Sequence, residues 1–274
     1  MEKQWKIQVW GTRGSFPMAS GDYLGYGGNT CCISIDCGER MIVFDAGTGL
    51  AGLGLYLKNQ EKEKRLDIFF SHAHIDHMIG LFGFSPFYDS QYKIHLYGEE
   101  RSGMDFKKQA EILLGEPYWP VGLDQFQAEV HTHQINAGEE VNLDQGIRIS
   151  AIPGFHPGGS TLYRLEGQKK SLVYGLDCEI NEDMWNAMIE FSREADMIIW
   201  DAQYTPEELK EKRGWGHSSW EQGIEMRKAS GAKRIMMIHY SWEYADHILK
   251  AQEEMARAQD ACCCFAKEGM EIVI

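Results

Sequence analysis

Four potential metal ligands lie within the stretch HAHIDH, which directly follows an apolar run. His72 and His74 alternate along the chain, so in an extended segment both side chains project to the same side and can bind one ion together. Asp76 and His77 are adjacent, lie where we expect a helix to begin at Met78, and can face a second ion. A catalytic zinc site usually has three protein ligands and an open position for water. The stretch alone therefore cannot complete either site.

Three residues further along the chain are candidates for the missing ligands. His156 lies in GFHPGGST, Asp177 in YGLDCE and His239 in MMIHYS, each after or at the end of an apolar run. A lone histidine in a fold is usually a structural residue, but several strands that end in ligand-type residues are what a site at one edge of a sheet requires. Together they offer one more ligand for each ion and a carboxylate that both ions could share.

The elements that must position these residues alternate between short apolar strands and helices. No Pro/Ser-rich linker divides the chain, so we expect a single domain over residues 1–274 with two sheets and helices outside them. Strands are predicted at Lys6–Trp10, Cys31–Asp36, Met41–Phe44, Leu66–Phe70, Ile94–Tyr97, Ile147–Ile152, Thr161–Leu165, Ser171–Leu176, Met197–Trp200, Arg234–Ile238 and Glu271–Ile274. Helices are predicted at Leu50–Asn59, Met78–Phe84, Gly103–Leu114, Glu182–Glu194, Pro206–Lys212, Ser219–Ser230 and Tyr244–Gln259.

Composition and charge limit the location and the partners of the chain. The sequence of 274 residues is 43% hydrophobic and carries a net charge of −14, without a dense basic patch. Long nucleic acids are therefore disfavoured as partners, whereas a small anion is compatible because bound metal ions reverse the local field. There is no apolar run long enough for a transmembrane helix and no signal-peptide pattern. The cysteines lack a disulfide framework, so we expect a cytoplasmic protein.

The motif HAHIDH resembles the HxHxDH signature of the metallo-β-lactamase superfamily. GTRGSFP, GGNT, VFDAGTG, WDAQY with the following GHSS…MMIHYS, and the closing CCCFAKEGMEIVI resemble its phosphodiesterase and ribonuclease Z-like branch. The resemblance implies an α/β fold of the metallo-β-lactamase type, an αββα sandwich of two mixed β-sheets flanked by helices. It also implies a hydrolase with two divalent metal ions. Zinc suits the imidazole-rich ligand set, and manganese is the alternative.

The resemblance also implies a role for each candidate ligand. His72, His74 and His156 would bind the first ion, Asp76, His77 and His239 the second, and Asp177 would bridge the two. A hydroxide held between the ions would attack the substrate, and His217, oriented by Asp201, would give a proton to the leaving group. We expect Asp76 to be a catalytic residue together with His217 and Asp201. Asp45 is expected to support the metal-binding loop, and Asn29 either lies near the site or serves its own turn.

The departure from ribonuclease Z indicates the substrate. In that enzyme a long tRNA-binding arm is inserted between the third metal histidine and the bridging aspartate, and the short segment 157–176 has no room for it. We therefore expect a phosphodiesterase for a small cyclic or nucleotide phosphodiester. The alternatives are a hydrolase of lactones, thioesters or lactams, a ribonuclease Z-like RNA endonuclease, and a non-catalytic ligand sensor. A homodimer is expected by analogy, and GEPYWPVG within Glu99–Gln145 is expected at a pocket wall or a dimer contact.

Overall fold

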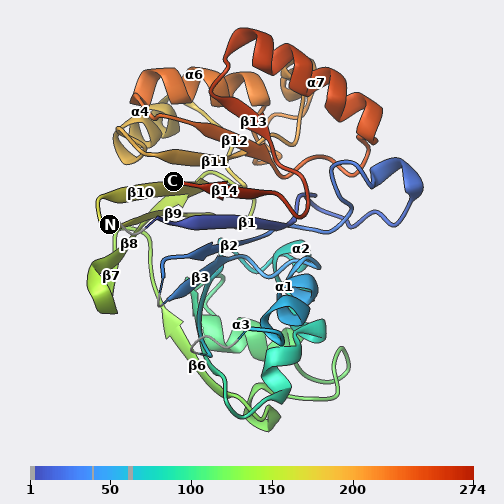
Figure 1. Ribbon diagram of the computed structural model, residues 1–274, viewed down its shortest axis with the longest axis vertical. Helices are drawn as coiled ribbons and strands as arrows, with labels where there is room; N and C mark the ends of the chain where they lie inside the picture. Colours follow the sequence, from blue (N-terminus) through green and yellow to red (C-terminus); the bar gives the residue numbers. More distant parts are fainter. Residues whose placement is uncertain (1–3, 39, 61–63) are drawn as a thin grey trace.

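Two β-sheets lie face to face at the centre of the computed structural model, which describes residues 4–38, 40–60 and 64–274. Figure 1 shows helices outside both sheets. Within the described residues, the first sheet has the order β14 (Glu271–Val273), β1 (Lys6–Gly11), β2 (Cys32–Asp36), β3 (Met41–Phe44), β4 (Arg65–Phe69), β5 (Lys93–Gly98) and β6 (Glu129–Gln134). The second has the order β13 (Cys263–Phe265), β12 (Ile235–Ile238), β11 (Met197–Asp201), β10 (Lys170–Gly175), β9 (Ser160–Gly167), β8 (Ile147–Gly154) and β7 (Glu140–Leu143).

Each sheet is mixed. Strands β1, β2, β3 and β14 pair antiparallel, whereas β3 to β6 pair parallel. The second sheet repeats this plan, with antiparallel pairs from β7 to β10 and parallel pairs from β10 to β13. Parallel strands place their carboxyl ends at one edge of a sheet, so both sheets offer a set of strand ends to a site there.

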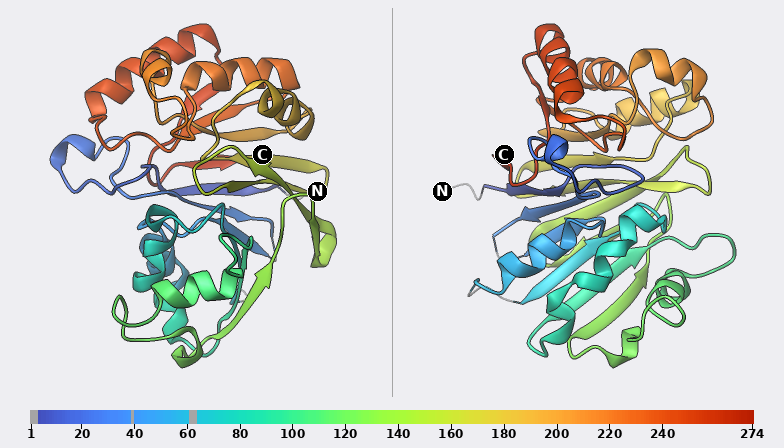
Figure 2. Two further views of the ribbon diagram at one scale, coloured as in Figure 1. Left: turned by 180° about the vertical axis from the view of Figure 1, so that it is seen from behind. Right: turned by 90° about the vertical axis from the view of Figure 1, so that its right-hand side faces the viewer.

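Helices cover the outer face of each sheet (Figure 2). The first sheet is covered by α1 (Leu50–Leu57), α2 (Ile75–Met78) and α3 (Phe106–Leu113), and the second by α4 (Glu182–Phe191), α6 (Trp220–Ser230) and α7 (Asp246–Gln259), with α5 (Pro206–Glu211) against α6. The predicted αββα sandwich is confirmed. No helix within the described ranges is long and apolar enough to cross a membrane.

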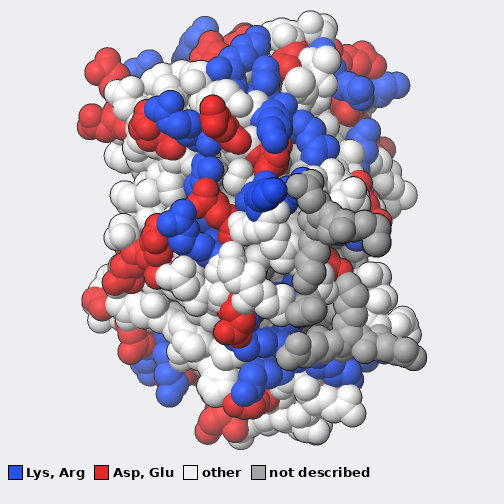
Figure 3. Space-filling model, turned by 60° about the vertical axis from the view of Figure 1, so that its left-hand side comes forward, with Lys and Arg blue, Asp and Glu red and all other residues white. Residues whose placement is uncertain are grey.

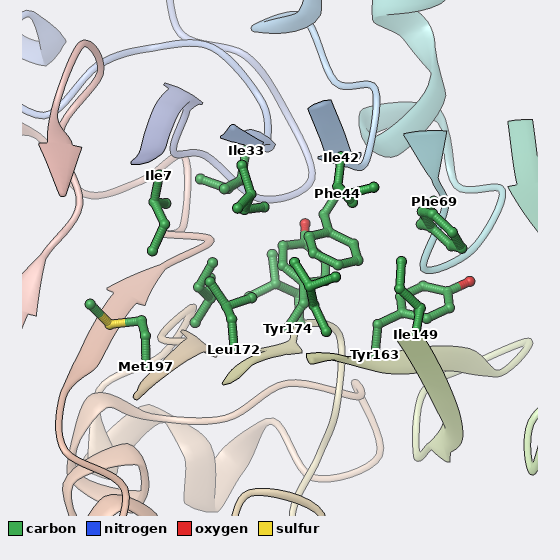
Figure 4. Close-up of a cluster of buried hydrophobic side chains, with 14 of the residues drawn as sticks. Ile7, Ile33, Ile42, Phe44, Phe69, Ile149, Tyr163, Leu172, Tyr174 and Met197 are labelled. Carbon is green, nitrogen blue, oxygen red and sulfur yellow. The ribbon is translucent and has the colours of Figure 1, made fainter. Parts of the chain in front are cut away.

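The space between the sheets is filled by alternating apolar side chains from both of them (Figure 4). Phe44 and Phe69 of the first sheet meet Tyr163 and Tyr174 of the second, and the rings of Phe44 and Tyr174 stack with centroids 4.8 Å apart. Such pairs contribute about 0.5–1.5 kcal/mol beyond the burial of their area. The packed interior fixes one sheet against the other, and thereby fixes the strand ends that carry the site.

The predicted strands all occur with small shifts of their ends, but β6, β7 and β13 were not predicted. Strands β6 and β7 are edge strands with half-exposed and exposed side chains, so they lack the apolar run that marks a buried strand. The helix expected at Met78–Phe84 is also corrected. Helix α2 begins at Ile75 and is followed by the 3-10 helix η2 (Ile79–Gly83). Asp76 and His77 therefore lie inside a helical turn.

A buried ion pair joins β4 to the loop before β3, and its loss should destabilise the fold. Arg40 donates to the fully buried carboxylate of Asp67, which also accepts a hydrogen bond of 3.2 Å from the Tyr97 hydroxyl. We expect Arg40→Leu to lower the free energy of unfolding by up to about 3–5 kcal/mol, because the buried carboxylate loses its closest cation and is left with the more distant Arg65 Nε, 3.8 Å away. The double variant Arg40→Leu/Asp67→Leu should recover most of that loss, as measured by urea denaturation.

The same ion pair predicts a dependence on pH. Burial raises the pKa of Asp67, so its contribution to stability is largest below the ordinary aspartate pKa and is lost as the pH rises through the raised value. The deficit of Arg40→Leu should therefore shrink as the pH is lowered from about 7 to about 5. An equal deficit at both pH values would contradict the assignment.

Candidate metal centre

The chemically active side chains of the sequence meet at one edge of the two sheets. Each follows the end of a strand or lies in the first turn of a helix, so the packed sheets and not the loops alone determine their positions. The elements are β3 with Asp45, β4 with His72 and His74, α2 with Asp76 and His77, β8 with His156, β10 with Asp177, β11 with Asp201 and β12 with His239.

One group consists of three histidines whose ring nitrogens converge. His74 Nδ1 and His156 Nε2 are 3.2 Å apart, and the ring of His72 lies 4.2 Å and 4.8 Å from theirs, centroid to centroid. The three together satisfy the spacing of a metal-binding group. Asp177 Oδ1 lies 3.8 Å from His156 Nε2 and 4.0 Å from His72 Nε2. Three imidazoles and one carboxylate oxygen therefore face the same point.

A second group lies directly beside the first. His77 Nε2 is 3.1 Å from Asp76 Oδ2 and 3.3 Å from His239 Nε2, and the other oxygen of Asp177, Oδ2, lies 3.2 Å from both of these histidine nitrogens. Each of the two carboxylate oxygens of Asp177 thus faces one group. This is the arrangement that a carboxylate shared by two cations requires.

Hydrogen bonds fix which ring nitrogen of two histidines is free. His77 Nδ1 donates to Asp45 Oδ2 over 2.8 Å, and His156 Nδ1 donates to the carbonyl oxygen of Gly216 over 2.9 Å. Asp45 is itself held by the Ser71 backbone N–H and the Tyr174 hydroxyl, each at 2.7 Å. Both rings therefore turn Nε2 towards the cluster, as metal-binding histidines with an oriented second nitrogen do.

Three of the strand-end residues have a left-handed backbone. Asp45, Asp177 and His239 have φ of 57°, 54° and 64°. Asp and His tolerate this region better than most residues, although it costs energy that the surrounding fold must supply. The backbone changes direction sharply at each of these strand ends, and this turns the side chains inward. A strand that continued straight would carry the chain past the site.

The charges of the cluster favour a cation between the two groups. Burial acts to raise the pKa of Asp177, but His239, His77 and His72 hold it well below its ordinary value. Burial likewise acts to lower the pKa of His239, but Asp177, Asp76 and Asp201 raise it to about 9. The pKa of His77 is also raised by its carboxylate neighbours against burial. The carboxylates thus stay ionised and stabilise positive charge at this point.

Two buried atoms test whether the cluster fits a metal. His72 Nε2 and Asp177 Oδ2 form no hydrogen bond within the described part of the chain, although both are buried. An unpaired buried polar atom costs free energy, and both atoms point into the cluster. A mixed set of imidazole nitrogens and carboxylate oxygens is the donor set of a divalent transition metal such as zinc. The residues therefore fit divalent metal ions.

His217 and Asp201, expected to act beside the metal ligands, also lie at the cluster, and together with Asp177 and His239 they satisfy the spacing of a further possible metal-binding group. His217 Nδ1 and Asp201 Oδ2 are 2.8 Å apart, and the His217 ring lies 5.1 Å from the His156 ring and 5.3 Å from the His239 ring, centroid to centroid. Asp201 also accepts the backbone N–H of Asp177. With Nδ1 engaged by the carboxylate, Nε2 of His217 is the nitrogen that can exchange a proton with a substrate.

Other sequence-based expectations are corrected or extended. The Asn29 side chain donates to Glu268 over 2.9 Å, so it holds its own turn to the C-terminal segment. In GEPYWPVG, the partly buried Trp119 stacks on Phe82 against the outer core of the first sheet, and the expectation of a pocket wall or dimer contact stays a prediction. Two contacts were not predicted from the sequence: Ser71 donates to Asp45, and the Ser15 backbone N–H donates to Asp76 over 2.8 Å. Ser71 directly precedes HAHIDH, which is the only local signal for it.

Comparison with known proteins agrees with this fold and cluster. A model of the beta-lactamase superfamily domain matches residues 40–240. The chain therefore belongs to this superfamily, among the metallo-β-lactamase-fold hydrolases of the ribonuclease Z-like branch. Ribonuclease Z of Pyrococcus furiosus is 26% identical over 288 aligned positions, which cover 84% of this chain and 90% of the relative.

Two solved structures share the fold. The metallo-beta-lactamase fold protein YhfI from Bacillus subtilis matches with a TM-score of 0.76 and 17% identity, covering 99% of this chain and 100% of that chain. A diphosphatase from the PhnP family matches with a TM-score of 0.70 and 18% identity, covering 99% and 97%.

The contact between Asp45 and His77 predicts a change in metal affinity. Asp45→Asn should lower the affinity for zinc about 10- to 100-fold, because the amide no longer stabilises the Nδ1–H of the metal-facing imidazole. Asparagine also tolerates the left-handed backbone at this position, so the fold should be retained. Competition with a chelating dye measures the affinity, and Asp36→Asn, on β2, is the matched control. Wild-type affinity in Asp45→Asn would refute the orienting role.

Proposed function

We propose that the protein is a dinuclear metal-dependent phosphodiesterase for a small cyclic or nucleotide phosphodiester. The observation that carries the proposal is the Asp201–His217 pair, with 2.8 Å between its carboxylate oxygen and ring nitrogen, beside the ligands assigned to the two ions. With Asp177 and His239 the pair also has the spacing of a metal-binding group, and we assign it to proton transfer. The group that departs from a phosphodiester is an alkoxide, which is a strong base and needs a proton. Hydrolysis of a lactam or thioester depends less on such a pair.

In this proposal the two groups hold zinc ions, with manganese as the alternative metal. When bound, the ions supply an activated water and neutralise charge on the phosphoryl oxygens. The first ion is assigned to His72, His74 and His156, the second to Asp76, His77 and His239, and Asp177 is shared between them. Asp76, which we also count among the catalytic residues, is held in place by the backbone N–H of Ser15.

The chain's own residues have separate tasks in the reaction. His217 Nε2 would give its proton to the oxygen of the departing group. Asp201 keeps the proton on Nδ1 of the same ring and stabilises the charge that the ring carries before the transfer. Burial of His217 and Asp201 excludes bulk water from this proton path. These roles require the leaving group of the substrate to lie on the side of His217.

Two features support a small substrate. Between His156 and Asp177 the chain forms only the hairpin of β9 and β10, without an arm for a folded RNA. The net charge of −14 opposes a polyanion. Figure 3 shows one face, on the side of the N-terminus and away from the carboxyl ends of the strands, where Lys and Arg side chains are interspersed with Asp and Glu. We also propose that residues 1–274 act as a single domain, whereas the homodimer expected by analogy stays a prediction.

Ribonuclease activity is the second candidate, and one observation favours it. The Pyrococcus furiosus relative, named ribonuclease Z, is similar over most of both chains. The two functions differ in the size of the substrate that the site must admit, so one panel of substrates separates them.

The test is a panel assayed with zinc- and manganese-loaded protein. We expect turnover of cyclic nucleotides and bis-p-nitrophenyl phosphate, and little turnover of a tRNA precursor, of nitrocefin or of a lactone. Faster cleavage of the precursor than of any small diester would establish the second candidate. Tight binding of a nucleotide without turnover of any substrate would indicate a ligand sensor. Light scattering of the same sample measures the oligomeric state.

A further inference from the structure

We infer that a pocket beside the first histidine group binds the organic group that stays attached to phosphorus, and that Arg101 determines its specificity. The inference rests on the proposed phosphodiesterase function and names its substrate class more closely. The pocket has a volume of about 260 Å³ and is bordered on one side by His72 and His74. Ala73, Met104 and Ile112 supply apolar surface around Arg101. A space of this size suits a group such as a nucleobase.

The backbone around Arg101 is held firmly. A tight turn follows β5, in which the backbone N–H of Arg101 donates to the carbonyl of Met104 over 3.0 Å and the reverse bond measures 2.9 Å. The Gln109 side chain of α3 closes this turn by donating to the carbonyls of Glu99 and Met104 over 2.9 Å and 3.0 Å. These hydrogen bonds fix the position of the Arg101 backbone, from which the side chain extends.

Among the described residues, the guanidinium is oriented mainly through Nη2. Nη2 donates to Glu99 Oε2 and to the Thr161 hydroxyl, each at 2.7 Å. Thr161 belongs to β9 and is fully buried, so the pair anchors Arg101 to the second sheet. Within the described part of the chain, Nη1 has a single bond, to the Gly158 carbonyl over a long 3.4 Å, which leaves donor capacity at Nη1 for a ligand.

A glycine keeps the Nη1 end of the guanidinium open. Gly159 has φ of +82°, and a residue with a side chain at this position would place its Cβ 2.2 Å from Nη1 of Arg101. Any other residue there would displace the guanidinium or close the space in front of it. The pocket thus combines an oriented hydrogen-bond donor with apolar walls.

The charge and the position of the pocket define what it binds. Glu99 already pairs with Arg101, so the site carries little net charge and favours a neutral acceptor, such as the carbonyl oxygen of a nucleobase, over a second anion. The lining includes His72 and His74 but not His217. Because the leaving group must lie beside the proton donor, the group in this pocket is the one that phosphorus retains.

Two esters with the same leaving group test the inference. Thymidine 5′-(p-nitrophenyl phosphate) and methyl p-nitrophenyl phosphate both release p-nitrophenolate and differ only in the retained group. We expect kcat/KM of the wild type to favour the thymidine ester. Arg101→Gln should lower the ratio of the two values about tenfold, because a charge-assisted hydrogen bond is lost. Ile112→Ser, at a side chain that is 46% exposed and therefore tolerant to change, should lower it several-fold. Arg193→Gln, at an exposed arginine in the turn after α4 that does not line the pocket, should not change it.

The outcomes separate this inference from the proposed function. Equal values for the two esters in the wild type, or a ratio that neither pocket variant lowers, would overturn the inference while the phosphodiesterase function stands. If neither ester is turned over, the proposed function fails, and calorimetric binding of thymidine 5′-monophosphate and methyl phosphate to the metal-loaded protein then tests the pocket. A preference for the thymidine compound that Arg101→Gln and Ile112→Ser both reduce would support the pocket even so, and equal binding would overturn it.

Discussion

His217→Ala should lower kcat for a cyclic nucleotide about 10²- to 10⁴-fold, which is the contribution expected of a general acid. The same variant should lose far less on bis-p-nitrophenyl phosphate, because p-nitrophenolate is a weak base and leaves without a proton. The structural reason is that His217 Nδ1 is fixed by Asp201 at 2.8 Å, which leaves Nε2 for the leaving group. Steady-state kinetics with both substrates measures the difference.

Metal content distinguishes a proton donor from a metal ligand in this experiment. His217→Ala should retain the metal stoichiometry of the wild type, because the ligand groups assigned above do not include it. His247→Ala, at an exposed histidine in the first turn of α7, is the matched control and should keep full activity. Equal losses on both substrates, or a loss of metal, would show that His217 acts on the cluster and not on the leaving group.

Asp177→Asn should have the largest effect of any single change. Asp177 is 2% exposed, and its two carboxylate oxygens face the two histidine groups separately, at 3.8–4.0 Å from the first and 3.2 Å from the second. A neutral amide removes the charge that compensates both ions. We expect the metal stoichiometry to fall below two per chain, and activity to fall by more than the roughly 10- to 100-fold cost of losing an outer partner.

The control for this prediction is Asp183→Asn, at an exposed aspartate in the first turn of α4. Asparagine is compatible with the left-handed backbone of position 177, so circular dichroism and thermal unfolding should show an intact fold. Emission spectrometry of desalted protein gives the stoichiometry. Two tightly bound ions and near-normal turnover in Asp177→Asn would rule out the shared carboxylate.

The sequence allowed the clustering of the candidate ligands to be predicted because most of them end or follow an apolar strand, and strand ends in a mixed sheet gather at one edge. It did not allow the hydrogen bonds that orient those ligands to be predicted. His156 donates to the carbonyl of Gly216, which lies 60 positions further along the chain. Such contacts exist only after the sheets have packed. The edge strand β6 escaped prediction for a related reason: its side chains are only half buried, so its sequence alternates too weakly.

The left-handed strand ends have a consequence for how this protein can change over many generations. At positions 45, 177 and 239 a residue must tolerate positive φ as well as supply the right chemistry, which favours Asp, Asn, His and Gly and disfavours β-branched residues most. Unbranched residues such as Glu194 and Gln145 also adopt positive φ in this chain, so the restriction is a preference. In a library selected only for folded protein, with no demand for activity, β-branched residues should still be depleted at all three positions. The backbone thus limits which side chains this candidate metal site can acquire, in addition to their chemistry.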